Sequence, residues 1–90
     1  MRRIIQTASF RREYKLQQRR GKQMVKLDLV VAHLARDGAL GLSYKPHKLG
    51  GKWRGHLECH IESDWLLIYK VDDTEVSLAR TGTHHDLFGK

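Results

Sequence analysis

The stretch Trp65–Val71 (WLLIYKV) decides the fold, because it is apolar on both faces of an extended chain except at Lys70. A continuous short apolar run of this kind is typical of a strand that is buried on both faces. Asp72 and Asp73 follow it and favour a hairpin turn, and residues 75–81 then carry the pattern of another strand. The sequence therefore predicts a central strand over residues 65–71 with a neighbouring strand after the turn.

Upstream of this stretch, every second residue from Trp53 to Ile61 is apolar or small, and the intervening residues are charged or histidine. A period of two predicts a half-buried strand over residues 53–61 with one polar face. The segment 42–51, which holds the only proline and His47, is expected to be the loop that leads into it.

The first half of the chain is expected to be helical after a short opening strand over residues 3–6. Ser9 is a suitable N-cap, and Phe10 and Tyr14 then share one face of the first helix. Gly21 is expected to end this helix, since glycine readily adopts the left-handed conformation of a helix C-cap.

A second helix is predicted to end at Gly38, with apolar residues spaced three and four apart at Met24, Leu27, Val31 and Leu34. The element order is then β-α-α-β-β-β. We predict a single α+β domain over residues 1–90, with two helices packed on one face of a small, mostly antiparallel sheet and the other face free to carry a site.

Composition points to a polyanionic partner. The 90 residues include 17 Lys and Arg against 10 acidic residues, a formal net charge of +7. Such an excess favours binding to nucleic acid, a membrane surface or an acidic protein. Cys59 is the only cysteine, which excludes an intramolecular disulfide and an all-thiolate metal site. No signal peptide or membrane-length apolar run is recognisable, so we expect a cytoplasmic protein without a membrane partner.

The histidines suggest where the chemistry lies, because five of the six fall between His47 and His85. His56, Glu58 and His60 would share one face of the predicted strand, and a metal site there is conceivable. Side chains two apart on a strand are about 7 Å from each other and such short patterns are unspecific, so a metal-dependent nuclease ranks last.

Cleavage of RNA without a metal requires a base for the 2′-hydroxyl, an acid for the leaving 5′-oxygen, and cations around the phosphate. Histidines and a carboxylate on a sheet face, with Arg80 on the next strand, would supply these groups. Trp65 and Phe88 are candidates for stacking on bases. Taken alone, these residues indicate a basic α+β domain that binds nucleic acid.

Three stretches together resemble the YafQ-type toxins of the RelE/ParE toxin–antitoxin superfamily. They are residues 47–55 (HKLGGKWRG), residues 60–70 (HIESDWLLIYK), and residues 80–84 (RTGTH) with Leu87-Phe88-Gly89. Their order and spacing match the family across the second half of the chain. The helical first half is similar in length and layout but carries no diagnostic motif.

The resemblance implies a ribosome-dependent mRNA endonuclease that works without a metal or other cofactor. It assigns the main proton transfer to His84, the catalytic carboxylate to Asp64 and the stabilisation of phosphate charge to Arg80. His47 and His60 complete the catalytic set, and the expected substrate contacts are Phe88, Trp65, Lys52 and Arg54. His85 and Asp86 stand where such toxins often carry small residues.

Several of these residues also have a purely structural interpretation. Trp65 would serve equally as a core residue, and Trp53 is assigned to the core because it lies on the apolar side of its predicted strand. Asp64 would cap a turn or orient His60, and Phe88 would be a hydrophobic anchor for the C-terminus. Five basic helix residues are either ordinary solvated charges or a surface for ribosomal RNA; they are Lys15, Arg19, Arg20, Lys22 and Lys26.

The implied partners are the ribosome, mRNA and a DinJ-like antitoxin that is acidic in its toxin-binding part. Two alternatives from other classes remain. One is a non-catalytic basic module that binds nucleic acid, and the other is an inactive toxin homologue that binds only the antitoxin.

Overall fold

Five strands form one sheet in the order β1-β5-β4-β3-β2 in the computed structural model, which describes residues 1–89. The strand β4 (Trp65–Val71) is central, as predicted, and is antiparallel to both β3 (Leu57–Glu62) and β5 (Glu75–Gly82). At the two edges, β2 (His47–Lys48) is antiparallel to β3 and β1 (Arg3–Gln6) is parallel to β5. The predicted mostly antiparallel sheet is confirmed.

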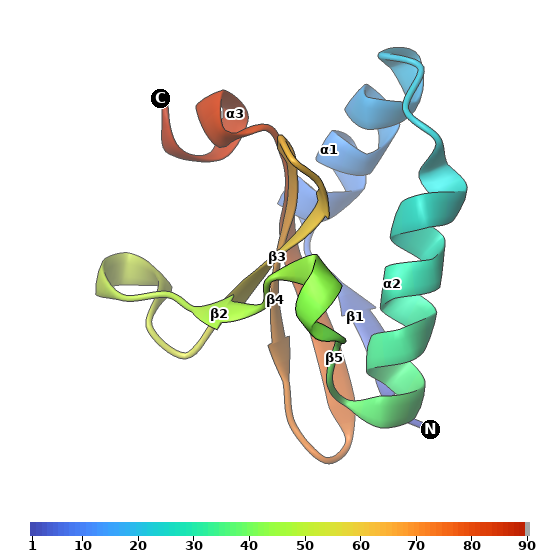
Figure 1. Ribbon diagram of the computed structural model, residues 1–90, viewed down its shortest axis with the longest axis vertical. Helices are drawn as coiled ribbons and strands as arrows, with labels where there is room; N and C mark the ends of the chain where they lie inside the picture. Colours follow the sequence, from blue (N-terminus) through green and yellow to red (C-terminus); the bar gives the residue numbers. More distant parts are fainter. Residues whose placement is uncertain (90) are drawn as a thin grey trace.

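Helices α1 (Ala8–Arg19) and α2 (Met24–Asp37) cover one face of this sheet (Figure 1). The core between the two layers is apolar and fully or almost fully buried, which is the main source of stability for so small a domain. Its largest members include Trp65, Tyr69, Phe10, Leu27, Leu34 and Leu67. The predicted α+β class is therefore confirmed, with both helices on the same side.

The prediction that Ser9 caps α1 is wrong, because the N-cap is Thr7. The Thr7 hydroxyl accepts a hydrogen bond from the Phe10 backbone N–H at 3.0 Å and donates one to the Ala79 carbonyl at 2.7 Å. The cap thus also fastens the start of α1 to β5. Gly21 and Gly38 adopt positive φ angles of 83° and 73° just beyond the two helices, as predicted.

The strand predicted over residues 53–61 is wrong at its start, since β3 begins only at Leu57. Residues 51–53 form a 3-10 turn, and Gly51 and Gly55 have positive φ angles of 60° and 89° that interrupt an extended chain. Gly55 fits the alternating pattern as a small residue, but its backbone is not extended. The predicted loop 42–51 also contains β2, which pairs His47 with Glu58.

The second face of the sheet is partly covered rather than free, which corrects the sequence-based expectation. The short helix α3 (His84–Phe88) and the segment 49–53 pack against it, and Trp53 lies half-buried here instead of in the main core. Figure 1 shows α3 and β2 on the side away from α1 and α2. Within residues 1–89, no helix has the length and apolar composition needed to cross a membrane.

Candidate active site

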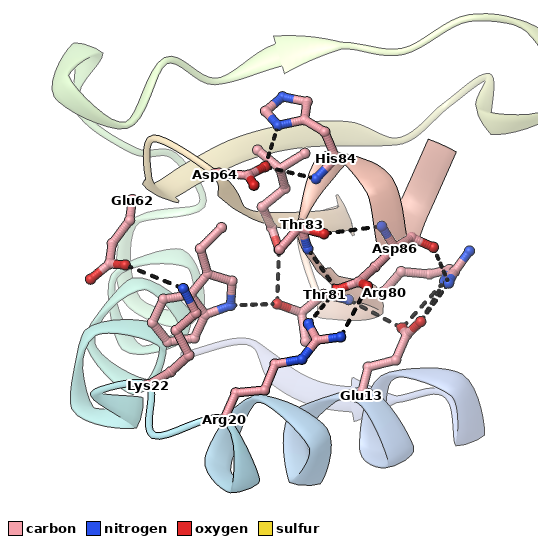
Figure 2. A network of polar contacts seen from close by, with 12 residues as sticks. Glu13, Arg20, Lys22, Glu62, Asp64, Arg80, Thr81, Thr83, His84 and Asp86 are labelled. Carbon is pink, nitrogen blue, oxygen red and sulfur yellow. Dashed lines mark hydrogen bonds and ion pairs between the residues drawn. The ribbon is translucent and has the colours of Figure 1, made fainter. Parts of the chain in front are cut away.

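The side chains of a histidine and an aspartate, far apart in the sequence, are hydrogen-bonded to each other at the surface. Asp64 lies in the turn between β3 and β4, and His84 is the first residue of α3. One Asp64 oxygen, Oδ1, accepts hydrogen bonds from the His84 ring Nδ1 at 2.6 Å and from the His84 backbone N–H at 2.9 Å (Figure 2). The backbone hydrogen bond first, and then the ring contact, hold the pKa of Asp64 below its ordinary value.

The hydrogen bond to Asp64 determines that Nδ1 of the His84 ring carries a hydrogen. A carboxylate only accepts hydrogen bonds, so Nδ1 is the donor and Nε2 points away from Asp64. The side chain of His84 is 44% exposed. The second ring nitrogen of His84 is thus available to exchange a proton with a bound molecule.

His60 and His47 continue from His84 in a row. The ring centroids of His84 and His60 are 5.8 Å apart, and those of His60 and His47 are 6.3 Å apart. The row runs from α3 across β3 to β2. The structure therefore brings together the three histidines and the carboxylate that the sequence singled out as catalytic candidates.

Glu58 belongs to the same group, although the sequence analysis placed it only in a doubtful metal pattern. Its Oε1 lies 3.2 Å from His47 Nε2 and 3.9 Å from His60 Nε2, and its side chain is 7% exposed. The Nδ1 of His47 faces the Lys45 carbonyl at 3.0 Å. The signal that would have found Glu58 is the pairing of β2 with β3, which sets His47 opposite Glu58 and could not be read from so short a strand.

Arg80 is engaged elsewhere. Its guanidinium donates hydrogen bonds to the Glu13 carboxylate on α1, with 3.0 Å between Nε and Oε2, and more weakly to the Asp86 carbonyl. Burial opposes this pair, but the hydrogen bond to Glu13 dominates and raises the pKa of Arg80. Among the described residues, its contacts are with Glu13 and Asp86 rather than with the histidine row.

Trp65 has no exposed surface, so the expectation that it stacks on a base is wrong. It lies in the main core, and its indole Nε1 donates a hydrogen bond to Thr81 Oγ1 at 3.0 Å. Phe88, at the end of α3, is 37% exposed, and Lys52 and Arg54 are exposed on the segment beside β2. These three remain accessible to a ligand.

His56 does not join Glu58 and His60 on a strand face, because it precedes β3. Its ring stands edge-on to Trp53, with the centroids 5.2 Å apart. In residues 1–89, no group of three histidine, cysteine or acidic residues is arranged to hold a metal ion. This removes the geometric basis of the His56-Glu58-His60 metal pattern.

Three of the five basic residues that were expected on the helices are paired with acidic residues, and two of these three, Arg20 and Lys22, lie in the connection between α1 and α2. Arg20 contacts Asp86, and Lys22 and Lys26 both contact Glu62. The other two are exposed. The basic helix surface is therefore partly neutralised by the chain itself.

Comparisons with known proteins agree on one family. Residues 2–89 match the family described as the bacterial toxin of type II toxin–antitoxin system, YafQ. The chain is 40% identical over 87 residues to the mRNA interferase toxin YafQ of Escherichia coli K12, an alignment that covers 96% of this chain and 95% of that protein.

Solved structures show the same similarity in three dimensions. The toxin in the crystal structure of the E. coli DinJ–YafQ complex superposes with a TM-score of 0.91 at 40% identity, covering 99% of this chain and 100% of that one. A metal-bound toxin from Helicobacter pylori superposes with a TM-score of 0.88 at 32% identity, covering 98% and 100% of the two chains.

Proposed function

Because the chain belongs to the YafQ family of bacterial type II toxins, we propose that it is an endoribonuclease that cleaves mRNA on the ribosome. The observation that carries this proposal is the Asp64–His84 pair, which orients the partly exposed ring of His84 beside His60. A proton-transfer group held in one orientation at an open surface suits a large substrate such as RNA.

The proposed reaction is acid–base cleavage. One histidine removes the proton of the 2′-hydroxyl, the 2′-oxygen attacks the phosphorus, and the bond from phosphorus to the 5′-oxygen breaks. A second histidine donates the proton that the leaving 5′-oxygen takes up. His84 supplies one of these groups and the His47–His60 pair supplies the other. The products are a 2′,3′-cyclic phosphate and a 5′-hydroxyl.

Other residues are proposed to hold the substrate. Phe88 is exposed at the opposite end of the five-residue helix α3 from His84, and it would stack on a base. Lys52 and Arg54 lie on the same segment of chain as His47 and would contact phosphates. Arg80 would reach a phosphate only by exchanging its Glu13 carboxylate for a phosphate oxygen, a bidentate contact of similar geometry.

We further propose that an acidic, DinJ-like antitoxin neutralises the protein. The related E. coli toxin was crystallised with DinJ, and this chain carries a formal charge of +7. Opposite net charges accelerate the encounter between two proteins, which would let an antitoxin capture a newly made toxin quickly.

The test is induced expression of the chain in bacteria, as wild type, His84→Ala and His85→Ala, with growth and transcript ends recorded. His85 is the matched control, because it is an exposed neighbouring histidine on the same helix. We expect growth arrest and cut mRNA with wild type and His85→Ala. The rate of cleavage by purified His84→Ala should fall about 10²–10⁴-fold.

The chemistry of the cut ends tests the mechanism separately. A cyclic 2′,3′-phosphate with a 5′-hydroxyl is expected. A 5′-phosphate would instead indicate a metal-activated water and overturn the acid–base proposal. A folded wild type that binds RNA in a salt-sensitive way but cuts nothing would identify a binding module. A wild type that binds only the antitoxin would identify an inactive homologue.

A further inference from the structure

The short helix α3 is fastened to the helical layer by one ion pair. Arg20, at the C-terminal end of α1, donates two hydrogen bonds to Asp86, with 2.6 Å between Nη1 and Oδ2 and 3.2 Å between Nη2 and Oδ1 (Figure 2). A bidentate contact of this kind fixes the relative orientation of both side chains. It joins residues that are 66 positions apart in the chain.

The same carboxylate also builds the first turn of α3. The Thr83 hydroxyl accepts a hydrogen bond from the Asp86 backbone N–H at 3.0 Å, and Asp86 Oδ2 accepts one from the Thr83 backbone N–H at 2.9 Å. This is a capping box. Asp86 lies so close to Gly82 that a Cβ on that glycine would be 2.8 Å from the Asp86 Cβ.

The electrostatic environment of Asp86 agrees with this double role. The hydrogen bond from Arg20 outweighs partial burial and, with the Thr83 contact, holds the pKa of Asp86 far below its ordinary value. The carboxylate is therefore charged at any pH at which the protein works. Both partners are therefore charged, and the contact with Arg20 is an ion pair.

His84 lies inside this arrangement, between the two residues of the capping box. Its backbone N–H and its ring both bond to Asp64, so the first turn of α3 is tied to the β3–β4 turn on one side and to α1 on the other. A helix of five residues is not stable by itself and depends on such external contacts. The position of the His84 ring therefore depends on where Asp86 is held.

We propose that Asp86, gripped by Arg20, is a positioning residue for His84, so that the end of α1 sets the reactive geometry of the site. The proposal rests on the proposed function for its catalytic consequence. Neither residue needs to touch the substrate. A shift of about 1 Å in a proton-transfer group can lower the rate of a reaction about 10²-fold, so losing the ion pair is expected to affect catalysis more than binding.

Arg20→Gln is the decisive variant, because it removes the ion pair and leaves both hydrogen bonds of the capping box in place. Arg12→Gln is the matched control, since it removes the same charge from another exposed side chain of α1. In single-turnover cleavage of mRNA on ribosomes, Arg20→Gln should lower the maximal rate about 10–100-fold. The half-saturating ribosome concentration should change less than twofold.

Arg20→Lys should recover part of this loss, because it keeps the charge but not the two-pronged contact. Arg12→Gln should behave as wild type. A raised half-saturating concentration with an unchanged maximal rate would overturn the proposal and make Arg20 a direct contact for RNA. Equal losses in Arg20→Gln and Arg12→Gln would overturn it as well, as a general effect of charge.

A second measurement does not depend on activity. The backbone amide of His84 donates to Asp64, so its ¹H and ¹⁵N chemical shifts report on that contact. Arg20→Gln and Asp86→Asn should both shift the His84 amide signal, and Arg12→Gln should not. Unchanged His84 signals in folded Arg20→Gln and Asp86→Asn would overturn the proposal. If the wild type cuts no RNA, the proposed function fails while the amide shifts still decide whether the ion pair positions His84.

Discussion

The carboxylate of Glu13 stands where a strand would otherwise pair with β5. It accepts a hydrogen bond from Arg80 Nε at 3.0 Å and one from the Thr81 backbone N–H at 3.3 Å. The pairing of β1 with β5 ends at Leu78, so the backbone beyond it lies on an open sheet edge. A single side chain from α1 thus satisfies the edge and holds Arg80 at the same time.

Glu13→Gln should destabilise the fold, because the neutral amide accepts weaker hydrogen bonds from a partly buried arginine. Hydrogen bonds to charged groups contribute about 1.5–3 kcal/mol, so we expect the free energy of unfolding to decrease by an amount in that range. Urea denaturation measures it. Glu75→Gln is the control, since its partner Arg3 is largely exposed and surface pairs contribute less than about 1 kcal/mol. Equal effects of the two substitutions would refute the edge role of Glu13.

Glu58→Gln tests whether the buried carboxylate serves the histidine row. Glu58 lies within ion-pair distance of His47 and His60, so its neutral analogue should lose the charge that orients both rings. We expect the rate of mRNA cleavage to fall about 10–100-fold, as for other groups that orient the primary chemical residues. Glu62→Gln is the control, because the Glu62 carboxylate contacts Lys22 and Lys26 and none of the three histidines. A full rate in Glu58→Gln would remove Glu58 from the site.

Cys59 should be unreactive in the folded protein. Burial, with the nearby Glu58 charge as a smaller cause, raises the pKa of its thiol to about 12. The reactive thiolate is therefore almost absent at neutral pH, and the sulfur is also shielded from solvent. Modification by an aromatic disulfide reagent should occur only at the rate of unfolding and become fast in urea. Rapid modification under native conditions would contradict the placement of Cys59.

Stability should fall in acid through Asp86. Its folded-state pKa lies below the ordinary value of about 3.9, so the protonated form is disfavoured in the folded protein. The stabilisation is complete above about pH 5 and is lost as the pH falls from about 4 through the folded-state pKa. Thermal unfolding of wild type and Asp86→Asn between pH 2 and 7 should give curves that differ at neutral pH and converge in acid. Parallel curves would exclude Asp86 as a source of the acid sensitivity.

Trp65→Phe should lower stability and leave RNA contacts intact. The substitution removes the indole hydrogen bond to Thr81 and leaves unfilled space in the main core. We expect a loss of about 1–3 kcal/mol in the free energy of unfolding, measured by urea denaturation. The half-saturating ribosome concentration should stay within twofold of wild type. A selective loss of ribosome binding with full stability would restore Trp65 as a substrate contact.

The elements with long, regular patterns were the ones that could be predicted from sequence. The run of buried residues in β4 and the three-and-four spacing in α2 depend on the chain itself and on one large core. The start of β3 could not be predicted, because the alternation from Trp53 onward continues through Gly55 while the backbone there adopts a positive φ.

In the site, too, the residues within sequence motifs could be predicted, and the contacts between residues far apart in the chain could not. His84, Asp64, His60 and His47 were identified by their resemblance to a family and do lie together. The partners of Arg80 and Asp86 come from α1, more than 60 positions away, and no local pattern announces them. Asp86 looked like a departure from the family, yet it caps α3 and binds Arg20.

The parallel pairing of β1 with β5 has a consequence for synthesis of the protein. Arg3 and its partner Glu75 are 72 positions apart, so the first of the five strands waits for the fifth. At about 5–20 residues per second, that interval is about 4–14 s. Throughout it the sheet is incomplete, and the turn that holds Asp64 lacks its contact with α3, which follows β5 in the chain. A ribosome that makes this chain therefore carries it in an unfinished form, and the three-histidine row assembles only after His84, which follows β5, has been made.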